Sequence, residues 1–124
     1  MSVNSTEFDT RIKGLRLRFV ERLVRDEVEL TELLHATFPI NRPCDVGALI
    51  SRIRLIAHKL HGAAAPFGFG AVGAAAARVE QAADMVFVSV QPNEPRILSD
   101  LENELYTATQ LLIDCLRNEL RSFA

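Results

Sequence analysis

The stretch "DVGALISRIRLIAHKLHGAAAPFGFG", residues 45–70, holds the pattern on which the fold prediction rests. Asp45 stands where a carboxylate can accept hydrogen bonds from the first backbone N–H groups of a helix. Pro66 with Gly68 and Gly70 indicates the end of that helix, because proline disfavours helical geometry at the residue before it. Between these signals, apolar residues recur at helical spacing, at Val46, Leu49, Ile50, Ile53, Ile56, Ala57 and Leu60. The stretch predicts one amphipathic helix and a tight turn.

The segments on either side repeat this pattern. The upstream helix is expected to be loosened at its start by Gly14 and to end near Phe38, where "FPINRP" begins. Its apolar stripe is Phe8, Ile12, Leu15, Phe19, Leu23, Leu30, Leu33 and Leu34. Downstream, residues 71–90 predict an alanine-rich helix, and Pro95 suits the first turn of a last helix. That last helix is expected to bury Leu98, Leu101, Leu105, Leu112, Cys115 and Leu116.

Four amphipathic helices with short Pro/Gly connections predict an all-α fold, an antiparallel up-and-down four-helix bundle. A short extra helical segment at the N-terminus is compatible with this plan. The chain has 124 residues, of which 48% are hydrophobic, which suits a single domain over residues 1–124. Because the four helices can cover one another, we expect a monomer.

Composition narrows the classes of partner. The formal net charge of −2 gives no broad basic surface, so nucleic acid is a poor candidate. No apolar run is long enough to span a membrane and the first residues lack a leader pattern, so we expect a cytoplasmic protein.

Cys44 and Cys115 are interpreted as a reduced loop thiol and a core thiol. The initial methionine and the full set of helices favour a free-standing protein over a piece of a larger hybrid kinase.

One histidine on the predicted second helix faces away from its apolar stripe. With Ile53 at the centre of the stripe, His58 falls at roughly 140° from it, on the solvent side. Gly62 lies one turn further on, although a glycine inside a helix costs about 1 kcal/mol relative to alanine. Helical side chains lean toward the N-terminus, so a larger residue at 62 would cover the imidazole. Two other interpretations stay open: an exposed histidine without a role, and a backbone packed closely against Gly62.

An exposed neutral imidazole nitrogen is a nucleophile that can form a covalent intermediate. If it accepts a phosphoryl group, Arg54 and His61 are the neighbours best placed to offset the added charge. Lys59 points further round the helix. Leu55 is exposed by the same geometry and suits a contact with a partner.

The segment "AHKLHGAAAPFG", residues 57–68, resembles the signature of the histidine phosphotransfer (HPt) domains of bacterial multistep phosphorelays. Glu80 corresponds to an acidic residue that is frequent on the next helix of that family. One position departs from the signature: His61 stands where the family usually has lysine, which makes its contribution dependent on pH. The residues that match in place are Ala57, His58, Leu60, Gly62, Ala63, Ala64 and Gly68.

This resemblance implies that His58 is the phosphoacceptor and that Gly62 clears access to it. It implies a phosphocarrier in two-component signal transduction, which exchanges phosphoryl groups with an aspartate of response-regulator receiver domains downstream of a sensor (hybrid) histidine kinase. Such a protein is not an enzyme with ATP-binding machinery and needs no cofactor, since Mg²⁺ is expected only in the receiver. The surface expected to meet partners includes Ser51, Leu55 and Ala65, and the residues expected to support the phosphoryl group are Arg54, Lys59, His61 and Gly62.

Two alternatives belong to other classes. His58 and His61 could share a metal ion, but zinc normally takes three or four protein ligands and no such set is visible in the sequence. The chain could instead be a non-catalytic interaction module, a degenerate HPt domain that regulates a two-component partner. The histidine at position 61 keeps this second alternative open, and the pairing of His58 with a clearing glycine argues against it.

Overall fold

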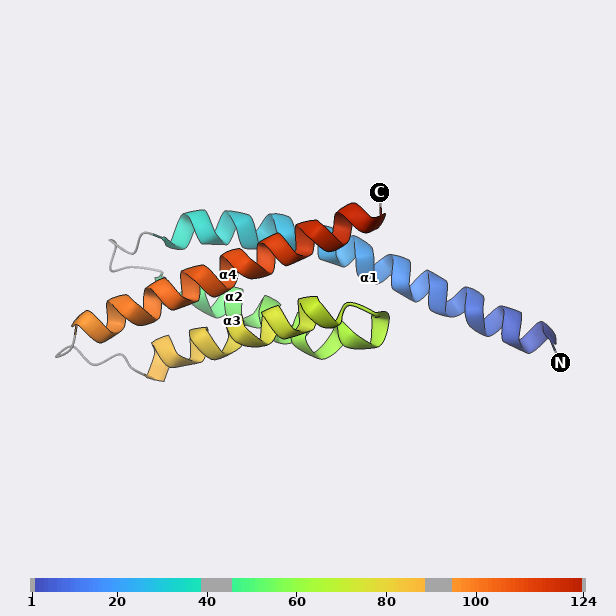
Figure 1. The fold of residues 1–124 in the computed structure, drawn as a ribbon, viewed down its shortest axis with the longest axis horizontal. Helices are drawn as coiled ribbons and strands as arrows, with labels where there is room; N and C mark the ends of the chain where they lie inside the picture. Colours follow the sequence, from blue (N-terminus) through green and yellow to red (C-terminus); the bar gives the residue numbers. More distant parts are fainter. Residues whose placement is uncertain (1, 39–45, 89–94, 124) are drawn as a thin grey trace.

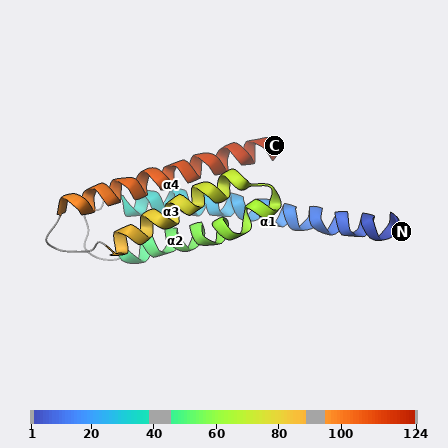
Figure 2. The same cartoon turned by 60° about the horizontal axis from the view of Figure 1, so that its bottom comes forward.

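The computed structural model describes residues 2–38, 46–88 and 95–123. It contains the helices α1 (Ser2–Thr37), α2 (Val46–Ala63), α3 (Gly70–Val88) and α4 (Pro95–Phe123), with a short 3₁₀ turn, η1 (Ala65–Phe67), between α2 and α3. Each helix runs antiparallel to the next, and α4 returns to lie beside α1 (Figure 1). Figure 2 shows the same arrangement after rotation. The described part of the chain has no strand, and the predicted all-α four-helix bundle is confirmed.

The core is formed by the apolar stripes of all four helices. On α2 the stripe lies as predicted, because Ile50, Ile53, Ile56, Ala57 and Leu60 are buried. The last helix buries Leu105, Leu112 and Leu116, with Leu101 and Cys115 partly buried against them. The predicted positions Cys44, Asp45 and the side chain of Leu98 lie outside the described residues.

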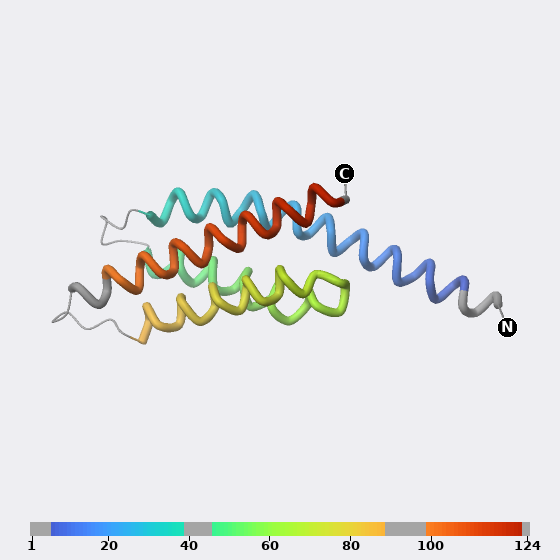
Figure 3. The backbone as a smooth tube through the Cα atoms, in the orientation of Figure 1, coloured from blue at the N-terminus to red at the C-terminus, as the bar shows by residue number. Residues whose placement is uncertain are grey.

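The N-terminal part of α1 corrects one prediction. Phe8, Ile12 and Leu15 are exposed, with Phe8 63% accessible, whereas the same stripe is buried at Phe19 and Leu23. The reason is length: α1 has 36 residues, α2 has 18 and α3 has 19, so the start of α1 projects past the bundle (Figures 1 and 3). The helix runs without a break through Gly14. The extra N-terminal segment is therefore a continuation of α1.

The connection between α2 and α3 is a tight turn. The carbonyl of Ala64 accepts hydrogen bonds from the N–H groups of Phe67, at 3.2 Å, and Phe69, at 2.9 Å. Gly68 has a φ of +88°, in the left-handed region that glycine adopts without strain. The ring of Phe19 in α1 lies 4.9 Å from that of Phe67 and 5.7 Å from that of Phe69. These contacts confirm the predicted helix break and tie the α2–α3 turn to α1.

Ion pairs hold α1 against two of its neighbours. Arg52 of α2 donates to Glu29 from Nε at 2.7 Å and from Nη2 at 3.1 Å. Arg117 of α4 donates from Nε to Glu27 at 2.6 Å. None of the helices in the described ranges is long and apolar enough to cross a membrane.

Candidate functional site

The side chain of His58 projects from the outer face of α2 and is 61% exposed. The core stripe of the helix lies on the other side, so His58 has the orientation that the periodicity predicts. His61, one turn later, is also exposed, at 53%. Both imidazoles are therefore accessible from solvent.

Glu80 of α3 joins these two histidines. Nδ1 of His58 is 2.8 Å from Glu80 Oε1, and Nδ1 of His61 is 3.1 Å from Oε2 of the same carboxylate. The Glu80 side chain is only 17% exposed, so it lies beneath the two imidazole rings. The resemblance had pointed to Glu80, but the helical pattern alone did not predict that one carboxylate would serve both histidines.

The hydrogen bonds fix the electrostatic state of this cluster. The hydrogen bond from His58 is the main cause that holds the pKa of Glu80 below its ordinary value of 4.5, and the bond from His61 adds to it, whereas burial opposes both. Glu80 is therefore a carboxylate at neutral pH and can only accept hydrogen bonds. Each bonded Nδ1 must carry a proton. In a neutral His58, that leaves Nε2 with a lone pair directed away from Glu80.

Arg54 lies one turn before His58 and does not point freely into solvent. Its Nε donates to Asp84 Oδ1 of α3 at 2.5 Å, and its Nη2 is 3.8 Å from Glu80 Oε1. The hydrogen bond to Asp84 raises the pKa of the Arg54 guanidinium further above its ordinary value. The guanidinium is thus close to His58 but held by two carboxylates. Asp84 was not anticipated from the sequence.

The remaining predicted residues lie on the same exposed side of α2 and the turn. A Cβ placed on Gly62 would meet no atom within 4 Å, so the interpretation that another backbone packs there is wrong. The surface next to His58 is open at this point. Ser51, Leu55, Lys59 and Ala65 are exposed.

A metal site is not supported by the donor set. Within the ranges that the structure describes, no group of three or more His, Cys, Asp or Glu side chains is arranged to hold a metal ion. Glu80, His58 and His61 are instead joined to one another by hydrogen bonds.

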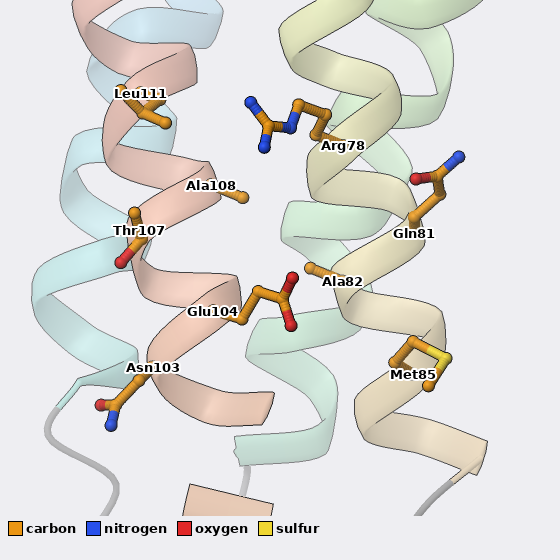
Figure 4. Close-up of a pocket in the computed structure, with 9 residues that line it drawn as sticks. All are labelled: Arg78, Gln81, Ala82, Met85, Asn103, Glu104, Thr107, Ala108 and Leu111. Atoms are coloured by element: carbon orange, nitrogen blue, oxygen red, sulfur yellow. The ribbon is translucent and has the colours of Figure 1, made fainter. Parts of the chain in front are cut away.

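A separate cavity of about 550 Å³ lies between α3 and α4. Arg78 of α3 and Glu104 of α4 reach into it from opposite walls (Figure 4). Glu80, which is hydrogen-bonded to His58, does not line this cavity, and neither do Arg54 and Asp84. It is therefore distinct from the cluster around His58.

A comparison with known protein families identifies the family of this chain. The family model described as "Hpt domain" matches residues 15–120, which begins within α1, shortly before its buried residue Phe19. Neither the curated proteins nor the solved structures give a match. The matched range covers most of the chain, includes all four helices of the bundle and contains the cluster of His58 and Glu80. This chain belongs to the Hpt domain family.

Proposed function

We propose that His58 accepts a phosphoryl group from an aspartate of a response-regulator receiver domain and can return it. Hpt domains are phosphocarriers without kinase machinery, and in phosphorelays they interact with receiver domains and histidine kinases. Both His58 and His61 are bonded to Glu80, so the observation that carries the assignment to His58 is the open surface at Gly62, one turn after it, where a side chain would cover its ring. The hydrogen bond from His58 to Glu80 keeps the proton on Nδ1 and leaves Nε2 of an exposed ring as the nucleophile.

The proposed transfer is a displacement at phosphorus. The Nε2 lone pair of neutral His58 forms a bond to phosphorus while the bond between phosphorus and the aspartyl oxygen breaks. The electron pair of that bond leaves with the aspartate carboxylate. The imidazole ring gains a positive charge, which the Glu80 carboxylate stabilises through the Nδ1–H bond. The reverse transfer follows the same path.

We propose that the partner supplies the rest of the chemistry of transfer. Phosphoryl transfer depends chiefly on positioning and on charge stabilisation. This chain would supply the nucleophile, the carboxylate behind it and nearby cations. We propose that Mg²⁺ is bound by the receiver alone and that the chain acts as a monomer beside a sensor (hybrid) histidine kinase and its receivers.

The test is transfer of label from a phosphorylated receiver in the presence of Mg²⁺. Wild type is expected to take up acid-labile, alkali-stable label, and His58→Gln is expected to take up none. His35→Gln is a matched control, because His35 is also exposed and its Nδ1 lies 2.8 Å from a backbone carbonyl, that of Thr31, with no carboxylate partner among the described residues. Label should persist in this variant.

Three results would overturn the assignment. Equal label on His58→Gln would move the phosphoacceptor elsewhere. Loss of label in His35→Gln would do the same. A folded wild-type protein that no receiver labels would favour the alternative of a non-catalytic interaction module.

A further inference from the structure

Residues one turn apart on α2 face residues one turn apart on α3. Arg54 and His58 occupy the α2 side, and Asp84 and Glu80 occupy the α3 side in the opposite order, as antiparallel helices require. Two cross-helix contacts result: Arg54 Nε to Asp84 Oδ1 at 2.5 Å, and His58 Nδ1 to Glu80 Oε1 at 2.8 Å. His58 and Arg54 are thus held by neighbouring carboxylates of one helix.

The contact between Arg54 and Asp84 is of a kind that exchanges readily. The Arg54 side chain is 38% exposed and the Asp84 side chain is 49% exposed. Ion pairs open to water in this way contribute little to stability, because solvent screens the charges and two long side chains lose freedom. The second contact of Arg54, with Glu80, is longer, at 3.8 Å. A stronger anion nearby can therefore displace Asp84 as the ion-pair partner of Arg54.

Phosphorylation of His58 would create such an anion within one helical turn of Arg54. A phosphoryl group carries more negative charge than a carboxylate and offers three acceptor oxygens. A guanidinium has five N–H donors in a planar fork that suits phosphoryl oxygens, and only Nε is engaged with Asp84 at hydrogen-bond distance. Asp84 and the phosphoryl group would thus compete for the same cation.

On the basis of the proposed transfer to His58, we propose that Asp84 acts as a latch. It holds Arg54 in the unphosphorylated protein, and the phosphoryl group on His58 releases Arg54 from it. Arg54 then stabilises phosphorylated His58, and the strength of the Asp84 contact sets how much phosphoryl the protein retains against its receiver. Arg54 and Asp84 are positioning residues in this scheme, since the bond to phosphorus is made by His58 alone.

The quantity to measure is the equilibrium partition of label between a receiver and this protein, because it does not depend on how fast the two proteins dock. Arg54→Gln is expected to shift the partition toward the receiver by about tenfold. Asp84→Asn is expected to shift it toward this protein by about threefold. In the double variant the Asp84→Asn effect should vanish, because the cation that it releases is gone.

A matched control is the Arg52–Glu29 pair, which joins α2 to α1 with the same Nε–carboxylate contact and a similar exposure. Glu29→Gln should leave the partition unchanged. Arg54→Lys should fall between wild type and Arg54→Gln, because lysine keeps the charge but lacks the fork. Melting curves for every variant separate effects on the site from effects on the fold.

The outcomes distinguish this inference from the proposed function. One outcome is that wild type is labelled on His58 while Asp84→Asn leaves the share of label on this protein unchanged or lowers it. That result would overturn the proposal that Asp84 restrains Arg54, and the proposal that the protein is a phosphocarrier would be retained. If Asp84→Asn raises the label equally with and without Arg54, Asp84 acts by direct repulsion and the latch is again overturned. If wild type takes no label, both proposals fall.

Discussion

Nδ1 of His58 and Nδ1 of His61 lie 2.8 Å and 3.1 Å from opposite oxygens of one carboxylate, that of Glu80. A single partly buried acceptor therefore orients two exposed rings. Any change at Glu80 therefore acts on the proposed phosphoacceptor, His58, and on His61 together.

The first prediction concerns Glu80 and the transfer rate. Glu80→Ala removes the acceptor for Nδ1–H, so His58 loses its fixed tautomer, and the rate of label uptake should fall by about tenfold. Glu80→Gln keeps a carbonyl acceptor but no charge and should be affected less. Single-turnover transfer from a phosphorylated receiver measures both rates. If the Glu80→Ala protein is folded and transfers at the wild-type rate, Glu80 does not position His58 for transfer.

The second prediction concerns stability at acid pH. Hydrogen bonds from His58 and His61 lower the folded-state pKa of Glu80. The contribution of Glu80 to stability is therefore fully present above its ordinary value of 4.5 and is lost as pH falls through the lower folded-state pKa. The difference in melting temperature between wild type and Glu80→Gln should thus shrink below about pH 4.5. A difference that grows toward acid pH would contradict the assignment.

The third prediction concerns His61. A lysine at this position would be charged and would carry three N–H donors. His61→Lys should therefore hold more label on His58 than wild type at about pH 8. The measurement is the ratio of label in the variant to label in wild type, since effects on His58 itself largely cancel in that ratio. A ratio of one would show that a lysine at position 61 gives no advantage.

The fourth prediction concerns Asp26, which lies on α1 between the buried residues Leu23 and Leu30. Its Oδ2 is buried without a hydrogen-bond partner among the described residues, and Arg22 Nε is 3.6 Å away. Burial raises the pKa of Asp26, so the folded state is stabilised as pH falls toward that pKa and is penalised above it. Asp26→Asn should raise the melting temperature at pH 7 by a few degrees and flatten its rise as pH falls toward the ordinary value of 3.8. Thermal unfolding across that range tests both effects.

The fifth prediction concerns the projecting part of α1. The side chains of residues 6–18 are exposed, and Phe8, Ile12 and Leu15 are not part of the core cluster. Removing residues 1–14 should therefore change the melting temperature by less than about 3 °C and leave label uptake intact. A large loss of stability would mean that this segment packs against the bundle in solution.

Local periodicity was sufficient to predict the helices and the outward face of His58. Each turn of α2 places Ile53, Ile56 and Leu60 on one side, so the opposite side follows from geometry alone. The same rule failed at Phe8, because a stripe predicts what a helix can bury but not whether another helix lies alongside it. The contacts of His58 and Arg54 with Glu80 and Asp84 depend on the register of α3 against α2. That register is set by the turn at Ala64 and Gly68, and helical spacing does not encode it.

The tight turn between α2 and α3 also bears on how the protein folds. The contacts around His58 join residues no more than 30 positions apart in sequence, with Arg54 and Asp84 the most distant pair. Closing so short a loop carries a small entropic penalty, and local contacts of this kind form early in folding. We therefore expect His58 and its carboxylates to assemble when this hairpin closes, and the Arg117–Glu27 contact between α4 and α1, which spans 90 positions, to form later.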